Sequence, residues 1–323
     1  MKIAFYNYTK VEHPHLIPIA QEAIKRGHKI KFLIHEPKND IFKIKKNLEE
    51  HNLNFTETKN LAHLQKIINK FNYTIFSEPM RIKVTPSGSK AIQIYHGIAN
   101  KGGHYIVEFE KLWFKSFVAG KHEYNELKKI VPEKIKDCHI VGYSKFDYKQ
   151  KTNIKKSLIP TCLYIPTWND QYSSLKYIGE KICNTNLRII VKLHNHTIER
   201  NNYWEKFYKE NKNIIYSTKE VNNLLKYCDV VLSDVSSAMF EAIAFNKPII
   251  AFTSPNANLK IGQIEYEFRK NKIINEAFSW EEVLNYLSNI KKLKITDYKI
   301  KKHLYKYKSG ASQKILNILE KSL

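Results

Sequence analysis

The order of apolar and amphipathic segments along the chain constrains its fold more than any other feature. Short apolar runs, typical of strands, alternate with segments whose apolar residues recur at helical spacing. The expected strands of the first half are 2–8, 28–35, 71–78, 91–97, 115–120 and 137–143. Because strands that are buried on both faces are almost continuously apolar, this order indicates a parallel sheet covered by helices on both sides.

The same order starts again after a polar, lysine-rich segment, 147–160, which ends in proline and which we interpret as a linker. The expected strands of the second half are 161–168, 187–194, 212–217, 227–234 and 247–252, and the residues from about 279 onward are typical of helices. A chain of 323 residues suits two domains of about 150 residues each. We expect an α/β protein with two doubly wound, Rossmann-like domains, over 1–150 and 151–323.

Several classes of protein are disfavoured by composition. No run approaches the roughly 18 apolar residues of a membrane-spanning helix, and the first residues indicate a strand rather than a signal peptide. The cysteines are far apart and lack CxxC spacing, so neither a zinc site nor a disulfide framework is indicated. We expect a cytoplasmic protein with no metal and no cofactor.

The formal net charge of +23 has two interpretations. One is an anionic partner, such as nucleic acid, a lipid surface or a phosphorylated substrate. The other is a composition biased toward lysine, since only five of the 54 basic residues are arginine. The segment 290–308, with eight lysines and three interleaved tyrosines, is the best candidate for contact with an anionic membrane, or it is simply a solvated helix face.

Polar side chains follow three expected strands of the second half, where these strands end. Thr167 lies near the end of the first strand, His194 ends the second, Asp234 ends the fourth, and Ser236 and Ser237 follow it. The carboxyl ends of parallel strands meet at one edge of a sheet, and ligands of doubly wound sheets bind beyond that edge. Hydroxyl and imidazole groups gathered there predict a site for a phosphate-bearing ligand.

The turn within "SDVSSAMFEAIAF", residues 233–245, carries serines where a phosphate-binding turn usually carries glycines. A helix that starts near Ser236 has unpaired backbone N–H groups and a positive dipole end, which with the hydroxyls of Ser236 and Ser237 could hold a diphosphate. Simple capping by Asp234 or Ser236 is the alternative, and the neighbouring strand that ends in His194 favours the phosphate. Glu241 could reach ribose hydroxyls or be a solvated helix residue.

The first half has its own polar strand end in "QIYHGIANKGGHY", residues 93–105. His96 beside Gly97 suits a general base, since imidazole titrates near neutral pH and glycine permits close approach of a substrate. A buried histidine that is hydrogen-bonded to the backbone is the alternative. Lys101 could pair with a phosphate as a point charge, and His13 and His15 are expected at the same edge, at the first strand-to-helix junction.

Three blocks together resemble the CDP-glycerol glycerophosphotransferase family, whose members build teichoic acids and related phosphate-polymer capsules. They are "YHGIANKGG" at 95–103, "YIPTW" at 164–168 and "SDVSSAMFEAIAFNKPIIAF" at 233–252, and "VKLHNH" at 191–196 falls where the family has a strand ending in histidine. This chain has Ile-Ala-Asn after His-Gly and Asn195 after His194, where the family usually has proline-containing sequences. The first forty residues resemble the opening unit of GT-B glycosyltransferases.

The resemblance implies a GT-B fold, with an acceptor-side first domain and a nucleotide-donor-binding second domain facing a central cleft. It implies that His96 deprotonates an acceptor hydroxyl. The hydroxyl would attack the β-phosphate of a CDP-alditol such as CDP-glycerol and release CMP. The implied acceptor is a polyol phosphate, a glycan or a lipid-linked chain, and the protein could bind the inner face of the cell membrane peripherally.

The resemblance also implies roles in the donor site. His194 would contact the diphosphate, and Ser236 with Ser237 would bind phosphate at the helix start. Glu241 stands where the family has an acidic residue that touches the ribose, and Thr167 stands where a strand of the second domain faces the cleft.

Two other functions stay open at this point. A glycosyltransferase or a sugar-nucleotide 2-epimerase of the same fold would also use an acidic residue near a nucleotide. A basic protein that binds nucleic acid or lipid would explain the charge. The shortage of arginine and the absence of a known nucleic-acid-binding motif count against a specific nucleic-acid partner.

Overall fold

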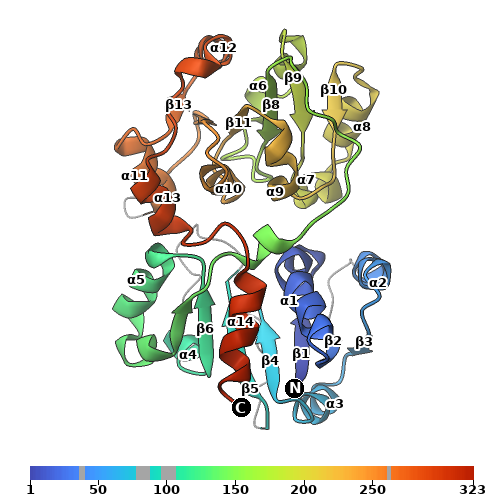
Figure 1. Ribbon diagram of the computed structural model, residues 1–323. Helices are drawn as coiled ribbons and strands as arrows, with labels where there is room; N and C mark the ends of the chain where they lie inside the picture. Colours follow the sequence, from blue (N-terminus) through green and yellow to red (C-terminus); the bar gives the residue numbers. More distant parts are fainter. Residues whose placement is uncertain (36–40, 78–87, 96–106, 260–262) are drawn as a thin grey trace. The chain divides into compact units, whose positions relative to one another are not determined.

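The computed structural model describes residues 1–35, 41–77, 88–95, 107–259 and 263–323, which form two compact units. The described residues up to Tyr148, together with Lys302–Leu323, make up the first unit, and Lys149–Lys301 make up the second. Each unit contains one parallel sheet (Figure 1). This confirms the expected α/β class.

The first unit is built on a seven-stranded sheet with the order β3-β2-β1-β4-β5-β6-β7. Its strands are β1 (Lys2–Asn7), β2 (Lys29–His35), β3 (Phe55–Thr58), β4 (Tyr73–Phe76), β5 (Lys90–Ile94), β6 (Lys115–Val118) and β7 (Cys138–Ile140). The chain runs outward from β1 to β3 and then, from β4, in the opposite direction. The strand order therefore reverses between β1 and β4, which is where doubly wound sheets bind their ligands.

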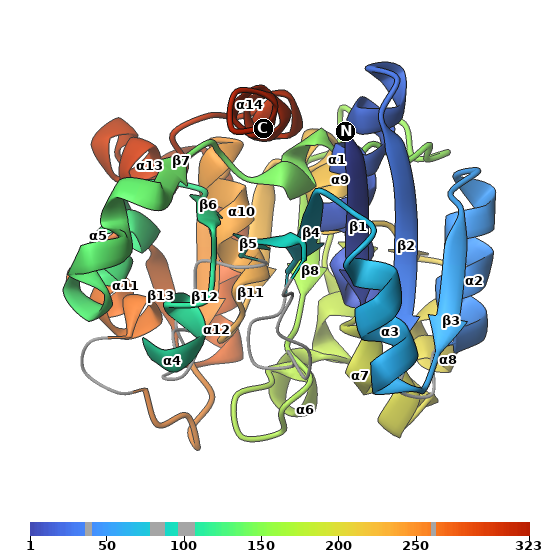
Figure 2. The same ribbon diagram turned by 90° about the horizontal axis from the view of Figure 1, so that it is seen from below.

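Helices cover both faces of this sheet, with α1 and α14 on one face and α3 on the other (Figure 2). The helices are α1 (His13–Lys25), α2 (Ile41–Glu50), α3 (Leu61–Ile68), α4 (Val107–Glu110), α5 (Lys121–Ile130) and α14 (Ala311–Glu320), with short 3-10 turns at Lys10–Glu12, Pro132–Asp137 and Ser144–Asp147. Pro14 lies in the first turn of α1, where its missing N–H has no intrahelical partner. The chain leaves this helix through Gly27 in the left-handed region, with a φ of 77°.

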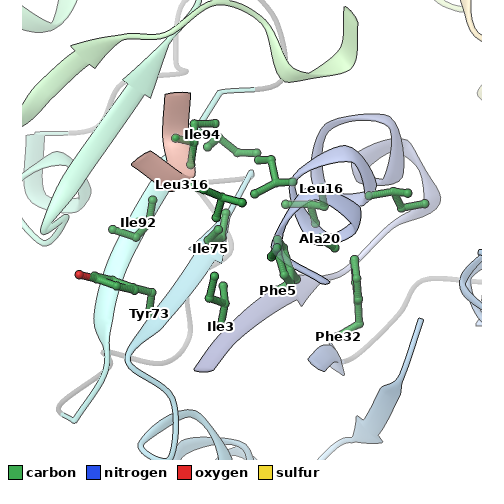
Figure 3. Close-up of a cluster of buried hydrophobic side chains, with 14 of the residues drawn as sticks. Ile3, Phe5, Leu16, Ala20, Phe32, Tyr73, Ile75, Ile92, Ile94 and Leu316 are labelled. Carbon is green, nitrogen blue, oxygen red and sulfur yellow. The ribbon is translucent and has the colours of Figure 1, made fainter. Parts of the chain in front are cut away.

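The last helix, α14, belongs to the first unit, whereas the sequence assigned all residues from 151 onward to the second domain. Its apolar residues Ile315, Leu316 and Leu319 are buried in the same core as α1 and the central strands, and Figure 3 shows Leu316 beside Ile75 and Ile94. The guanidinium of Arg26 donates to Glu320 at 3.0 Å. An apolar helix face is stable only against another apolar surface, and for α14 that surface is provided by the first unit.

The second unit is built on a six-stranded sheet with the order β10-β9-β8-β11-β12-β13. Its strands are β8 (Thr161–Ile165), β9 (Arg188–Val191), β10 (Ile214–Tyr216), β11 (Val230–Ser233), β12 (Ile249–Phe252) and β13 (Asn275–Ala277). The order reverses between β8 and β11, which are paired in parallel from Val230 opposite Cys162 to Ser233 opposite Ile165. The loops that follow these two strands flank the point at which a ligand is expected.

The helices of the second unit are mostly short. They are α6 (Leu175–Ile178), α7 (Asn195–Arg200), α8 (Tyr203–Glu210), α9 (Val221–Leu224), α10 (Ala238–Ala244), α11 (Ile264–Lys270) and α12 (Trp280–Ser288), while the boundary between the two units falls within α13 (Tyr298–Leu304). In the described part of the chain, no helix is long and apolar enough to cross a membrane.

Candidate functional site

The carboxyl edge of the second sheet brings the loops after β8, β9 and β11 together. The loop after β11 reaches the loop after β8 through Asp234, whose Oδ1 accepts a hydrogen bond of 2.8 Å from the backbone N–H of Thr167. The loop after β9 reaches the same β8 loop through His194, whose ring centroid lies 6.3 Å from that of Trp168. Candidate residues from three separate stretches of sequence thus lie at one edge of one sheet.

Asp234 joins two of these loops and is fully buried. Its Oδ2 accepts two hydrogen bonds of 2.8 Å from Ser174, one from the backbone N–H and one from the hydroxyl. Burial raises the pKa of Asp234 to about 6, and these hydrogen bonds and the charge of Arg269 oppose the rise. Arg269 also donates to the backbone oxygen of Asp234 at 3.1 Å. Both carboxylate oxygens of Asp234 therefore accept hydrogen bonds that hold the loops after β8 and β11 together.

The two serines at the start of α10 differ in their bonding. Ser236 is 9% exposed, and its hydroxyl oxygen accepts a hydrogen bond of 3.3 Å from the backbone N–H of Ala238. Ser237 is the N-cap residue of α10, and its hydroxyl makes no hydrogen bond within the described residues. Local capping thus occupies Ser236 but leaves the half-buried hydroxyl of Ser237 available to a ligand.

Glu241 lies in α10 and is only 3% exposed. It is therefore not the solvated helix residue that the sequence left open as the alternative to a role at the ribose. Thr167 is also 3% exposed. Its contact in this region is the hydrogen bond that its backbone N–H donates to Asp234.

His194 is half-buried at the start of α7, where its ring caps the helix. Nδ1 accepts a hydrogen bond of 3.1 Å from the backbone N–H of His196. In a neutral imidazole that accepts at Nδ1, the proton is carried by Nε2. Nε2–H is then a hydrogen-bond donor, which is the kind of group that binds a phosphate oxygen.

A cavity of about 540 Å³ opens beside these histidines, among the β8 loop, α6 and the α7–α8 region. Trp168 and Trp204 line it, together with Thr197, Arg200 and Lys176. The guanidinium of Arg200 lies 4.4 Å from the ring centroid of Trp168, a cation–π contact that fixes one face of the ring. The lining mixes aromatic rings, cations and the carboxylates of Asp170 and Glu180.

Gly179 allows the ring of Trp204 to pack closely against α6 at the wall of this cavity. A Cβ atom at Gly179 would lie 2.7 Å from the ring of Trp204 and 2.4 Å from the backbone oxygen of Leu175. Any other residue there would push the ring away from α6. Arg200 and Trp204 were not predicted as site residues, because they lie within helices, α7 and α8, and not at a strand end. The signal for Trp168 was its place at the end of "YIPTW".

The histidines at the carboxyl edge of the first sheet have a different environment. His13 is 1% exposed, with Nε2 2.8 Å from Asn7 Oδ1 and Nδ1 2.6 Å from Asn47 Oδ1. Burial lowers the pKa of His13 to about 4, although the hydrogen bond to Asn47 acts in the opposite direction. His15 is 2% exposed and packs edge-on against Tyr143. Both side chains are buried within the first unit.

The remaining candidates, His96, Gly97 and Lys101, lie outside the described residues. The residue before them, Tyr95, is buried and donates a short hydrogen bond to Glu110. Burial raises the pKa of Glu110 to about 7. Among the described side chains, no group of three or more histidines, cysteines and carboxylates could hold a metal ion.

Solved structures of similar fold cover nearly the whole chain. The wall teichoic acid polymerase TagF aligns with a TM-score of 0.66 at 14% identity, over 99% of this chain and 89% of that one. A TagF variant soaked with CDPG aligns with a TM-score of 0.64 at 12% identity, over 99% and 88%. The UDP-GlcNAc 2-epimerase of Methanocaldococcus jannaschii aligns with a TM-score of 0.63 at 15% identity, over 99% of both chains. The fold is therefore GT-B-like, as expected.

The sequence itself gives a more specific result than these structural likenesses. No curated protein sequence matches the chain. The model of the family described as CDP-glycerol:poly(glycerophosphate) glycerophosphotransferase matches residues 120–318, which is more than half of the chain and includes every donor-site candidate from Thr167 to Glu241. The chain belongs to the CDP-glycerol:poly(glycerophosphate) glycerophosphotransferase family.

Proposed function

We propose that this protein transfers glycerol phosphate, or a related alditol phosphate, from a CDP-activated donor to a hydroxyl acceptor in the synthesis of a cell-envelope polymer such as teichoic acid or capsule. The observation that carries the proposal is the cluster at the carboxyl edge of the second sheet. There the Ser237 hydroxyl and the Trp168 ring lie on loops that Asp234 joins, and the His194 ring on the loop after β9 lies beside Trp168, all inside the region that matches the family.

The donor would be held by the second unit. Ser237 offers a hydroxyl without a protein partner among the described residues, and His194 offers a ring nitrogen that can donate to a phosphate oxygen. Ser236 adds its backbone and hydroxyl, and Glu241 is the candidate for the ribose. The flat ring of Trp168 is a candidate surface for the base or the alditol.

Transfer would need a base for the acceptor, and His96 is the candidate, with Gly97 permitting close approach and Lys101 offering a charge for a phosphate. The acceptor oxygen forms a bond to the β-phosphorus as its proton passes to His96. The bond from that phosphorus to the bridging oxygen breaks, and CMP leaves with the bridging oxygen and both bonding electrons. Stabilising the charge on the phosphoryl oxygens is the main requirement of such a step.

The acceptor would be a polyol phosphate, a glycan or a lipid-linked chain, and an anionic membrane surface is a candidate partner. In the second unit, the exposed side chains of Lys291, Lys292 and Lys294 lie close in sequence to Ile295, which is 54% exposed. Cations beside exposed apolar groups favour binding to anionic lipid. Sedimentation with anionic vesicles, compared with neutral ones, tests this part of the proposal.

Thermal unfolding in the presence of different nucleotides tests the donor. We expect CDP-glycerol or CDP-ribitol to raise the melting temperature more than UDP-sugars do, with CMP intermediate, because binding to the folded state stabilises it. Stabilisation by UDP-sugars alone would instead favour a glycosyltransferase or a sugar-nucleotide epimerase and would overturn the proposal.

Replacing the base tests the chemistry separately from binding. His96→Ala is expected to abolish transfer and to leave the shift caused by CDP-glycerol largely intact. The exposed His63 in the first unit provides a matched control, and His63→Ala is expected to retain activity. Loss of donor binding in His96→Ala would assign His96 to the donor and not to the acceptor proton.

A further inference from the structure

A basic groove of about 700 Å³ lies along one edge of the second unit, where the linker residues 151–155 pass beside β9 and β10. The charged residues of its lining are all cations: Lys151, Lys155, Arg188 and Lys219. The neutral polar groups of the lining come from serine, threonine, asparagine and tyrosine side chains. By contrast, the cavity beside Trp168 mixes cations with carboxylates.

The alternation of side chains along the strands explains why Arg188 faces this groove. Ile189 and Val191 of β9, with Ile214 of β10, belong to the buried core on one face of the sheet. Successive side chains of a strand point to opposite faces, so Arg188 and Ile215 lie on the other face. The groove is therefore built on the face that the linker crosses.

The linker is held in place next to the groove by two hydrogen bonds of Gln150. Its backbone N–H donates to Asn223 Oδ1 at 3.0 Å, and its side-chain oxygen accepts from the backbone N–H of Glu220 at 2.7 Å. Glu220 is the N-cap residue of α9, and Asn223 lies within that helix. These bonds hold the start of the linker against the start of α9.

The cations of the groove lack protein partners among the described residues. None of the four side chains has an ion pair or a hydrogen bond in this part of the chain, and Nη1 of Arg188 is buried without an acceptor there. The neighbouring Lys209, in comparison, pairs with Glu205 at 2.8 Å. A buried donor without an acceptor destabilises the folded state, so an anion that reaches Arg188 would stabilise this region.

The groove shares no lining residue with the cavity beside Trp168 or with the donor candidates. Arg188 is the first residue of β9 and lies opposite Thr161, the first residue of β8, at the amino edge of the sheet. The donor candidates follow the carboxyl ends of the strands. The four residues of β9 span roughly 13 Å, and the groove continues past the end of β10 to Lys219, so more than one phosphate could lie along it.

We infer that this groove binds successive phosphodiester groups of an anionic acceptor chain. Arginine binds phosphate through a planar pair of donors, while lysines on flexible stems bind as point charges and suit a repeating polyanion. The inference rests on the proposed function, since that reaction lengthens or starts a phosphate polymer. Holding the chain away from the donor site would keep the acceptor bound between transfers.

Binding of a labelled synthetic oligo(glycerol phosphate) to the full chain tests the inference by fluorescence anisotropy. Arg188→Gln is expected to weaken binding about 10-fold. The pair Lys151→Gln with Lys155→Gln is expected to weaken it and to lower the slope of log K against log salt by about one for each phosphate that is no longer bound. Lys212→Gln, an exposed lysine outside the lining, serves as the matched control and is expected to change neither quantity.

Competitors distinguish the sources of the phosphate, and the melting temperature of each variant confirms that it folds. Inorganic phosphate and single-stranded RNA are expected to compete more weakly than the unlabelled oligomer. Unchanged oligomer binding in both the Arg188 variant and the lysine pair, or equal competition by RNA or phosphate, overturns the inference. The donor shift with CDP-glycerol is measured in the same variants; its absence in the unmodified protein would count against the proposed function and not against the groove.

Discussion

The two sheets carry histidines at the same kind of position, just beyond a carboxyl edge, but their surroundings differ. In the first unit, both ring nitrogens of His13 contact asparagine side chains and the residue is buried. In the second unit, His194 uses one nitrogen to cap a helix and is half-buried beside Trp168. Polar residues at strand ends therefore occur in two environments, either buried with both ring nitrogens in contact with side chains or half-buried at a helix start beside a cavity. Burial and bonding distinguish them.

Of the changes considered, Asp234→Ala is expected to lower the free energy of unfolding most. It removes the hydrogen bonds that join the loops after β8 and β11 in the second unit. Three buried donors would lose their acceptor: the backbone N–H of Thr167 and both donors of Ser174. We expect a loss of about 3 kcal/mol or more in the free energy of unfolding, together with weaker donor binding. Denaturant titration of the full chain measures the first quantity.

Asp170 is the matched control for this prediction. It is exposed in the same loop, so Asp170→Ala should change the free energy of unfolding by less than about 0.5 kcal/mol. Equal effects of the two changes would mean that Asp234 does not hold the loops.

We expect His13 to make the free energy of unfolding depend strongly on pH. Its pKa falls from 6.5 in the unfolded chain to about 4 in the folded one, so the unfolded state binds more protons between these values. The stability due to neutral His13 is present above pH 6.5 and is lost as the pH falls toward 4, by about 3 kcal/mol in total. Unfolding of His13→Gln, which cannot titrate, should lack this dependence when measured from pH 4 to 8.

Glu123, in the same unit, is expected to change stability with pH in the opposite direction to His13. Burial raises its pKa to about 8, so its contribution is present below pH 4.5 and is lost as the pH rises toward 8. Glu123→Gln should therefore gain stability over the unmodified protein as the pH rises, whereas His13→Gln should gain it as the pH falls. If the stability of both variants relative to the unmodified protein changed in the same direction with pH, the burial of His13 or of Glu123 would be contradicted.

A smaller effect, confined to binding, is expected for Trp168→Ala. Removing the ring takes away one wall of the cavity and the partner of Arg200. We expect the affinity for the CDP-activated donor to fall about 10-fold, in line with the roughly 1–3 kcal/mol that stacking of a base on an aromatic ring provides. Isothermal titration measures this. Phe278→Ala, which removes a 59% exposed ring in the same unit, should leave the affinity unchanged.

The smallest effects should separate the two serines. Ser237→Ala is expected to lower donor affinity several-fold with little change in stability, because its hydroxyl has no partner within the described residues. Ser236→Ala should also lower stability by about 0.5–1 kcal/mol, because its hydroxyl accepts from Ala238. Unchanged affinity in both variants would limit these residues to the start of the helix.

The central strands of both sheets could be predicted from the sequence, because burial on both faces requires apolar residues at nearly every position. The two strands that were not predicted, β3 and β13, are outermost in their sheets. β3 reads "FTET" and β13 reads "NEA", and only the last residue of each is buried. Strands of this kind owe their conformation to pairing with a neighbour and have no apolar pattern of their own.

The place of α14 and the role of Asp234 could not be predicted for a related reason. The sequence shows an apolar helix face, but it does not say which of two cores that face will meet. It likewise shows an aspartate at a strand end. Whether that carboxylate is bonded within the protein depends on Ser174, which is 60 positions away along the chain. Local pattern predicts where polar groups gather, while interactions between residues distant in sequence decide which of them remain available.

The return of α14 to the first unit has a consequence for synthesis on the ribosome. The strands and α1 of the first unit emerge early, but Ile315, Leu316 and Leu319, which complete their core, emerge only after Lys149–Lys301. The described residues of the second unit, Lys149–Lys301, form one continuous segment, which can fold as soon as it has left the exit tunnel. The half of the molecule that is translated first is therefore the half that finishes folding last.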